Sequence, residues 1–133
     1  MKHQDLDVWK KSIDITTLIY KTTENFPQHE QFGLVSQMRR CAVSIPSNIA
    51  EGCARFSDKD TIKFLSISLG SIAELQTQLI IAKNLQYANN SDDIIEELEV
   101  IKRMILNLSK YLKNKENPLW KGLFTFHILL TTC

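Results

Sequence analysis

The sequence lacks an excess of one charge and a long uncharged run. It has 133 residues, with 16 lysines and arginines against 15 aspartates and glutamates, for a formal net charge of +1. A nearly neutral chain has no overall field that attracts nucleic acid or anionic membrane, so such binding would need a local patch. No uncharged run reaches the roughly 18–20 residues that cross a bilayer. The first residues, MKHQDLDVWKK, have no apolar signal-peptide core. These absences predict a cytoplasmic protein with no membrane span.

Residues suited to catalysis or metal binding are also scarce. The three histidines are scattered, the three cysteines form no CxxC, and no Glu-x-x-His pair of the kind used by di-iron bundles is present. The four glycines form no phosphate-binding loop. Ser44 and Ser47 have no neighbouring His or Lys to activate them. The sequence therefore predicts no catalytic residue, no metal site, no cofactor and no enzyme.

Four segments with helical apolar spacing follow one another, and none before the C-terminal tail resembles a strand. They run over about Asp5–Asn25, Glu30–Gly52, Ser57–Tyr87 and Ser91–Asn114. In the first, Leu6, Trp9, Ile13 and Tyr20 share an apolar face, widened by Val8, Ile15 and Ile19; the cleanest apolar stripe, in the last, comprises Ile94, Leu98, Ile101, Ile105, Leu108 and Leu112. Short connections between long helices favour antiparallel neighbours. The predicted fold class is therefore all-α: an antiparallel up-down four-helix bundle over residues 1–115. Residues 116–133 form an apolar C-terminal tail that is not an independent domain.

The second segment contains a proline and a glycine that are expected to affect the helix. Pro46 removes one backbone hydrogen bond and clashes with the preceding turn. A kink is expected there, and a complete break stays open. Gly52, near the segment's end, is typical of a C-terminal cap. Ser57 is typical of the N-cap of the next helix.

Two of the predicted helices carry an outward face that an isolated bundle does not need. Small or apolar residues stand there instead of long charged ones, and exposed isoleucines in one line are costly unless covered. The predicted interface with other copies comprises Ser44, Ser47, Glu51, Ile67, Gly70, Glu74 and Ile81. The alternative is a wide core face with scattered apolar residues at the surface, which is common.

Basic residues cluster around the same two helices and suggest contact with nucleic acid. The candidates are Arg39, Arg40, Arg55, Lys59 and Lys63. The two adjacent arginines either pair with acids such as Glu51 or Glu74 or contact phosphate, which suits their planar guanidinium groups. A merely solvated charged face remains the alternative.

Three stretches of the chain carry a family resemblance: MRRCAVSIPSNIAEGCAR (Met38–Arg55), FLSISLGSIAELQTQL (Phe64–Leu79) and DLDVWKKSIDI (Asp5–Ile15). Together they resemble the bacterial 23S rRNA-intervening-sequence proteins. The resemblance implies an antiparallel four-helix bundle that assembles as a homopentamer. It also implies a fold related to the accessory protein of diversity-generating retroelements, which binds nucleic acid and a reverse transcriptase.

The resemblance and the basic residues lead to one functional hypothesis and one alternative. The hypothesis is a non-enzymatic oligomeric bundle that binds or scaffolds RNA, DNA or a ribonucleoprotein partner, with a reverse transcriptase or a ribosomal component as candidate partners. The alternative is a purely structural or protein-interaction oligomer with no nucleic-acid role.

Overall fold

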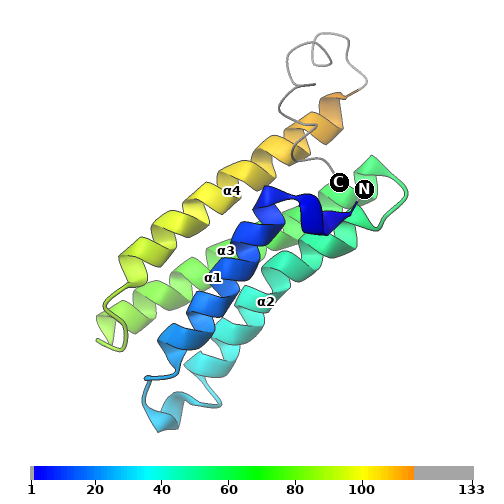
Figure 1. Cartoon of the computed structure of the whole chain (residues 1–133). Helices are drawn as coiled ribbons and strands as arrows, with labels where there is room; N and C mark the ends of the chain where they lie inside the picture. The colour runs from blue at the N-terminus through cyan, green and yellow to red at the C-terminus, as the bar shows by residue number, and fades with distance from the viewer. Residues whose placement is uncertain (1, 116–133) are drawn as a thin grey trace.

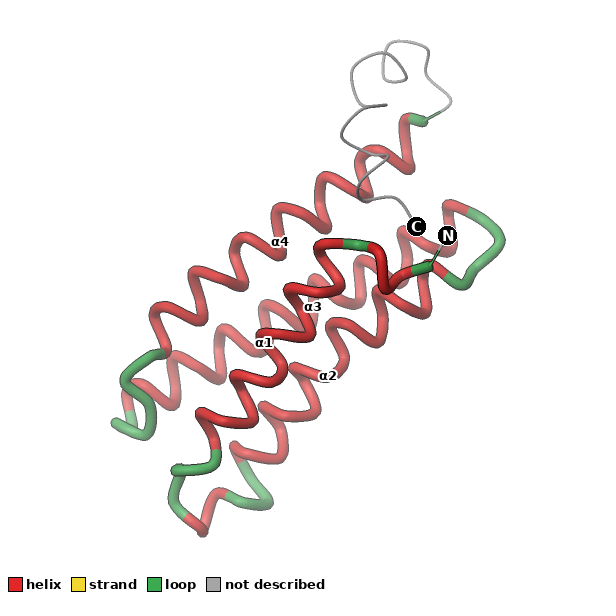
Figure 2. The backbone as a smooth tube through the Cα atoms, in the orientation of Figure 1, coloured by secondary structure: helices red, strands yellow, loops and turns green. Residues whose placement is uncertain are grey.

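The computed structural model describes residues 2–115 and contains four long helices. They are α1 (Asp7–Thr23), α2 (Leu34–Cys53), α3 (Asp58–Asn84) and α4 (Ser91–Asn114), with short 3-10 turns at His3–Asp5 and Gln28–Glu30 (Figures 1 and 2). No strand is found among these residues. The prediction of an all-α chain with four helices is confirmed, whereas the predicted tail, residues 116–133, lies outside the described residues.

Each helix lies beside two others, as a four-helix bundle requires. Helix α2 contacts α1 and α3, and α4 closes the bundle by contacting α3 and α1. The α1–α2 and α3–α4 loops lie at one end, and the α2–α3 loop lies at the other (Figure 1). The most extensive contact joins α2 to α3.

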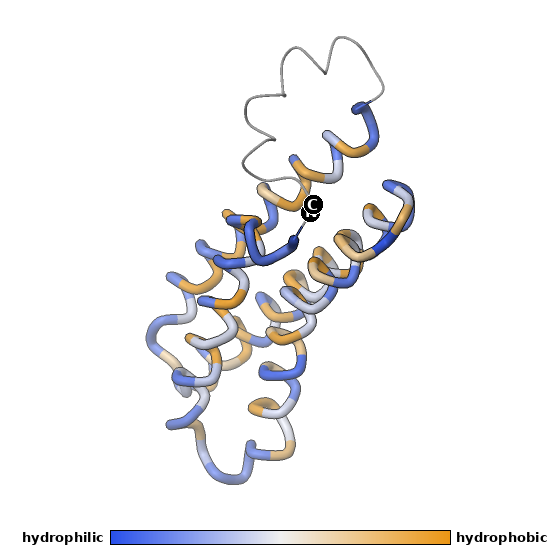
Figure 3. The backbone as a smooth tube through the Cα atoms, turned by 45° about the vertical axis from the view of Figure 1, so that its right-hand side comes forward, coloured by the Kyte–Doolittle hydropathy of each residue, from blue (hydrophilic) through white to orange (hydrophobic). Residues whose placement is uncertain are grey.

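The core follows the amphipathic pattern of the helices, whose hydropathy alternates along the chain (Figure 3). The predicted apolar stripe of α4, from Ile94 to Leu112, is entirely buried. In α1 the buried face is instead centred on Val8, Ile15 and Ile19. Ile13 and Tyr20, which the pattern placed on that face, are 37% and 42% exposed.

Helix α2 runs without interruption through Pro46, so the alternative of a complete break is wrong. Proline offers no backbone N–H to the carbonyl of Ala42, one turn earlier. The hydroxyl of Thr16 on α1 lies 3.1 Å from that carbonyl oxygen and 2.8 Å from the Ser12 carbonyl oxygen, so its one proton is shared between the two. A side chain of the neighbouring helix thus partly replaces the missing backbone donor, and the predicted kink stays a prediction.

The contact between α2 and α3 is close because small residues line it. A Cβ at Gly52 would lie 3.1 Å from Phe64 Cβ and 3.2 Å from the Thr61 carbonyl oxygen. Hydroxyl groups also cross the interface: Thr61 donates to the Gly52 carbonyl at 2.8 Å, and Ser68 donates to the Ile45 carbonyl at 3.0 Å. Gly52 is helical and has no positive φ, so the prediction that it caps α2 is wrong.

The start of α3 agrees with the sequence prediction, whereas the end of α3 and the start of α2 differ from it. Ser57 does cap α3, because its Oγ accepts from the Asp60 N–H at 3.2 Å. Helix α3 nevertheless stops at Asn84, before the expected Tyr87. Gln86, with φ of 62°, takes the left-handed conformation that usually falls to glycine. Helix α2 begins at Leu34, because a 3-10 turn occupies Gln28–Glu30.

Two glycines provide a matched test of the α2–α3 contact. Alanine is the better helix former by about 1 kcal/mol. Gly52→Ala should still lower the free energy of unfolding, by up to about 2 kcal/mol, because overpacking costs about 1–3 kcal/mol. Gly70 has no atom within 4 Å of its would-be Cβ, so Gly70→Ala should raise that free energy by about 1 kcal/mol. Urea denaturation at one low protein concentration measures both, and changes of the same sign would contradict the packing argument.

Candidate functional surface on helices α2 and α3

The candidate residues gather on what we call the outer face: Arg40, Ser47 and Glu51 of α2, with Lys63, Ile67, Gly70, Glu74 and Ile81 of α3. All of these residues are exposed. Ile67 and Ile81 expose 46% and 43% of their surface, and Glu74 lies between them along the helix. The structure therefore places both halves of the predicted interface on the outside of the bundle, on neighbouring helices.

The outer face differs from the outside of α4 in its charge. Between Lys63 and Lys83 the only charged residue of α3 is Glu74. Helix α4 instead exposes a succession of charged residues: Asp92, Asp93, Glu96, Glu97, Lys102, Arg103, Lys110 and Lys113. Helix α3 is long and apolar enough to cross a membrane by length and composition alone, and 33% of its most apolar 18-residue stretch is buried in the bundle. Core packing accounts for only part of that apolar character.

One predicted interface residue has its partner within the chain. The hydroxyls of Ser44 and Ser71 lie 2.5 Å apart across the α2–α3 contact, and Ser44 also donates to the Cys41 carbonyl at 2.8 Å. Ser44 is therefore half-buried at the edge of the outer face. Its small size serves the contact between α2 and α3 of the same chain.

The buried thiol of Cys41, beside these serines, is expected to have low reactivity. Cys41 Sγ donates to the Ser71 carbonyl at 3.0 Å. Burial, followed by the nearby Glu74 carboxylate, raises the pKa of the Cys41 thiol from 9.0 to about 12. Because the thiolate is the reactive form, Cys41 is poorly suited to act as a nucleophile near neutral pH.

Arg39 holds two helices together. Its Nε donates to Thr23 Oγ1 at 2.9 Å, and its Nη2 donates to the Tyr20 carbonyl at 3.2 Å. The guanidinium also lies 4.7 Å from the centre of the Tyr20 ring. A cation at the C-terminal end of α1 is favoured by the helix dipole. Arg39 therefore binds α1, whereas the sequence suggested an acid or a phosphate.

The other four basic candidates do not form one patch. Arg55 pairs with Glu51 at 2.7 Å and stacks on Phe64. Arg40, Lys59 and Lys63 make no ion pair with a described acid. At 1.5 Å per residue, Arg40 lies about 20 Å from the end of α2, whereas Lys63 lies about 8 Å from the adjoining start of α3. Lys59 and Lys63, one helical turn apart, thus lie together near the α2–α3 loop, whereas Arg40 lies about 12 Å farther along the bundle.

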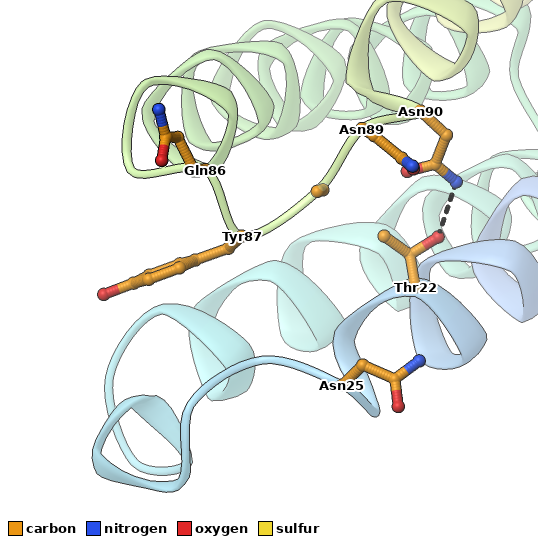
Figure 4. Close-up of a pocket in the computed structure, with 7 residues that line it drawn as sticks. Thr22, Asn25, Gln86, Tyr87, Asn89 and Asn90 are labelled. Atoms are coloured by element: carbon orange, nitrogen blue, oxygen red, sulfur yellow. Dashed lines mark hydrogen bonds between the residues drawn. The ribbon is translucent and has the colours of Figure 1, made fainter.

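A hollow lies at the end of the bundle that holds the α1–α2 and α3–α4 loops, between α1 and the α3–α4 loop (Figure 4). It measures about 310 Å³ and is lined by uncharged residues: Thr22, Asn25, Gln86, Tyr87, Ala88, Asn89 and Asn90. Asn90 Nδ2 donates to Thr22 Oγ1 at 3.0 Å, while the Tyr87 side chain extends away from both. Sequence reasoning missed this site because its residues come from segments far apart in the chain. Without a cation, it offers no electrostatic attraction to phosphate.

Within residues 2–115, no group of three or more His, Cys, Asp or Glu side chains could hold a metal ion. The features on which chemistry could be built are therefore the outer face and the unpaired cations. Together with the four-helix core, they define a helical-bundle protein whose candidate functional region is the outer face of α2 and α3.

The comparison with protein families identifies this class more narrowly. The chain belongs to the family of 23S rRNA-intervening sequence proteins, whose pattern matches residues 4–107. The match covers α1 to α3 and most of α4, and it confirms the resemblance seen in the sequence. No curated protein matches the chain.

The two adjacent arginines should respond differently to truncation. Arg39→Ala removes the hydrogen bonds to α1 and should lower the free energy of unfolding by about 1 kcal/mol. Arg40→Ala should change it by less than about 0.5 kcal/mol, as is usual for an exposed side chain without partners. Urea denaturation of both variants measures the difference. Equal losses would contradict the assigned role of Arg39.

Proposed function

We propose that this chain is a non-enzymatic cytoplasmic protein whose antiparallel up-down bundle assembles with copies of itself, and that the assembly binds RNA. The outer face is the observation that carries the proposal. It is apolar or small along α3, has one acidic residue between Lys63 and Lys83, and is continuous with Arg40 and Ser47 of α2. A solvated helix normally carries long charged residues there, as α4 does.

The proposal of self-association rests on the free-energy cost of exposing the apolar part of this face to water. Burying apolar surface is worth about 25 cal/mol per Å², and Ile67 and Ile81 are each almost half exposed. Gly70, between them in the chain, allows another backbone to approach closely, because no atom lies within 4 Å of its would-be Cβ. Homopentamers are what the family resemblance implies, and a closed ring would cover the outer face of every copy.

RNA binding depends on that assembly. In one chain only Lys59 and Lys63 are neighbours, and Arg40 lies about 12 Å away along the bundle, so a single chain offers a small basic surface. Cyclic repetition would arrange them in bands around a ring. Contacts would be made to phosphates, because no base-reading pattern accompanies the cations. A ribosomal component or a reverse transcriptase is then a candidate protein partner, as the resemblance implies.

The second candidate function is a purely structural or protein-interaction oligomer. Arg39 and Arg55, two of the five basic candidates, are engaged within the chain. This observation favours a scaffold with little electrostatic attraction to nucleic acid. Both functions require the same interface and differ only in whether the assembly retains RNA.

The proposed assembly is tested by measuring the molar mass of the protein in solution. Light scattering should give a mass that is a multiple of 15.3 kDa, and the proposed pentamer should give five times that value. Ile67→Lys with Ile81→Lys should release folded 15.3 kDa monomers, because burying two unpaired ammonium groups in the interface is costly. The matched control is Leu18→Lys with Leu106→Lys, at similarly exposed positions of α1 and α4. If both pairs of substitutions leave the mass unchanged, the outer face is not the interface.

RNA binding is tested with a fluorescein-labelled 23S rRNA fragment and DNA of the same sequence. Binding should weaken as salt rises, with a slope set by the number of phosphate contacts. Arg40→Gln with Lys63→Gln should weaken it about tenfold or more, whereas Arg103→Gln with Lys113→Gln on α4 should have little effect. Light scattering must show that the assembly is intact. No retention even at low salt would refute RNA binding and favour the scaffold.

A further inference from the structure

The described chain ends beside the start of α3. Lys115, directly after α4, places its Nζ 3.1 Å from an Asp58 carboxylate oxygen. Asp58 is the first residue of α3. The last described residue is therefore linked by an ion pair to the first turn of that helix.

The surface of those first turns is a strip of apolar and long aliphatic groups. Lys59, Asp60, Ile62, Lys63, Ser66 and Ile67 border a shallow cavity of about 700 Å³. Ile67 is 46% exposed, and Ile62 is half-buried against the core. The methylene stems of the two lysines extend the apolar area while their ammonium groups can stay in water. The strip continues into the outer face at Ile67.

The sequence after Lys115 is rich in large apolar residues. Residues 116–133 read ENPLWKGLFTFHILLTTC, in which Glu116 and Lys121 are the only charged side chains apart from His127. The family match ends at residue 107, before this segment. Trp120 is five positions after Lys115, and five positions of chain can span up to about 17 Å. The helical strip from Asp58 to Ile67 is about 14 Å long.

We propose that residues 119–126 of this chain bind the strip formed by Ile62, Lys63, Ser66 and Ile67 of its own α3. Reach and composition both fit, and tethering favours this occupant over a second copy. A segment attached by a few residues has an effective concentration in the millimolar range. A free copy must reach that concentration to compete. Ile67 then lies at the boundary between the bound segment and the part of the outer face that contacts other copies.

The test uses Trp120 as a reporter in the full chain. The only other tryptophan is Trp9, so Trp9→Phe leaves Trp120 as the single tryptophan, which can be excited apart from the tyrosines. Acrylamide should quench native Trp120 several-fold less than the same chain unfolded in urea. Adding Ile67→Lys should move the quenching at least halfway to the unfolded value, because the charge disrupts the apolar strip. Leu106→Lys, at an equally exposed position on α4, should leave it unchanged.

Each contrary result is specific. Equal quenching of native and unfolded chain overturns the proposal, and so does equal protection in the Ile67→Lys and Leu106→Lys variants. Protection lost on dilution together with the larger mass would show that another copy holds the segment, which also overturns it. Protection that persists in a 15.3 kDa monomer supports the proposal while refuting self-association. If Trp9→Phe unfolds the chain, ¹⁹F resonances of 5-fluorotryptophan in the unaltered protein report on both tryptophans separately.

Discussion

The close contact between α2 and α3 is the constraint on which the rest of this molecule depends. It exists because Gly52 has no side chain and because serines and a threonine stand where larger residues would separate the helices. The hydroxyls satisfy one another or bond to carbonyl groups of the facing helix, so close packing leaves these polar atoms paired. Two helices held at this distance present one continuous outer face, and every functional inference about the protein concerns that face.

The distribution of cations shows why a list of basic residues is a poor measure of nucleic-acid binding. Arg39 satisfies a carbonyl near the end of α1, and Arg55 is shared between Glu51 and the Phe64 ring. Arg39 would lose its hydrogen bonds to α1 on moving to a phosphate, whereas the exposed Arg55–Glu51 pair is of the kind that contributes little to stability. Of the remaining cations, Lys59 and Lys63 are one turn apart and Arg40 lies about 12 Å away. The proposed RNA binding therefore relies on repetition of these cations in an assembly.

The sequence predicted what periodicity alone can determine. The stripe of α4 is strong and regular, and its bounds and buried residues were predicted closely. The end of α3 was not, because Gln86 takes a conformation for which glycine is the usual signal. The Arg39 contacts and the Thr16 bond to the Ala42 carbonyl were also missed. Each joins residues on different helices, and spacing along one helix carries no information about its neighbour's register.

The exposed isoleucines of α3 are not needed to complete the core of the bundle. Leu65, Ile72 and Leu79 fill the inner side of α3, so Ile67 and Ile81 add nothing to the interior. The two covers proposed for them suit different parts of the helix: the segment after Lys115 would reach the first turns, whereas a second copy would reach the more distant ones. Ile67 stands where the two meet, so its cover decides how much of α3 remains for assembly.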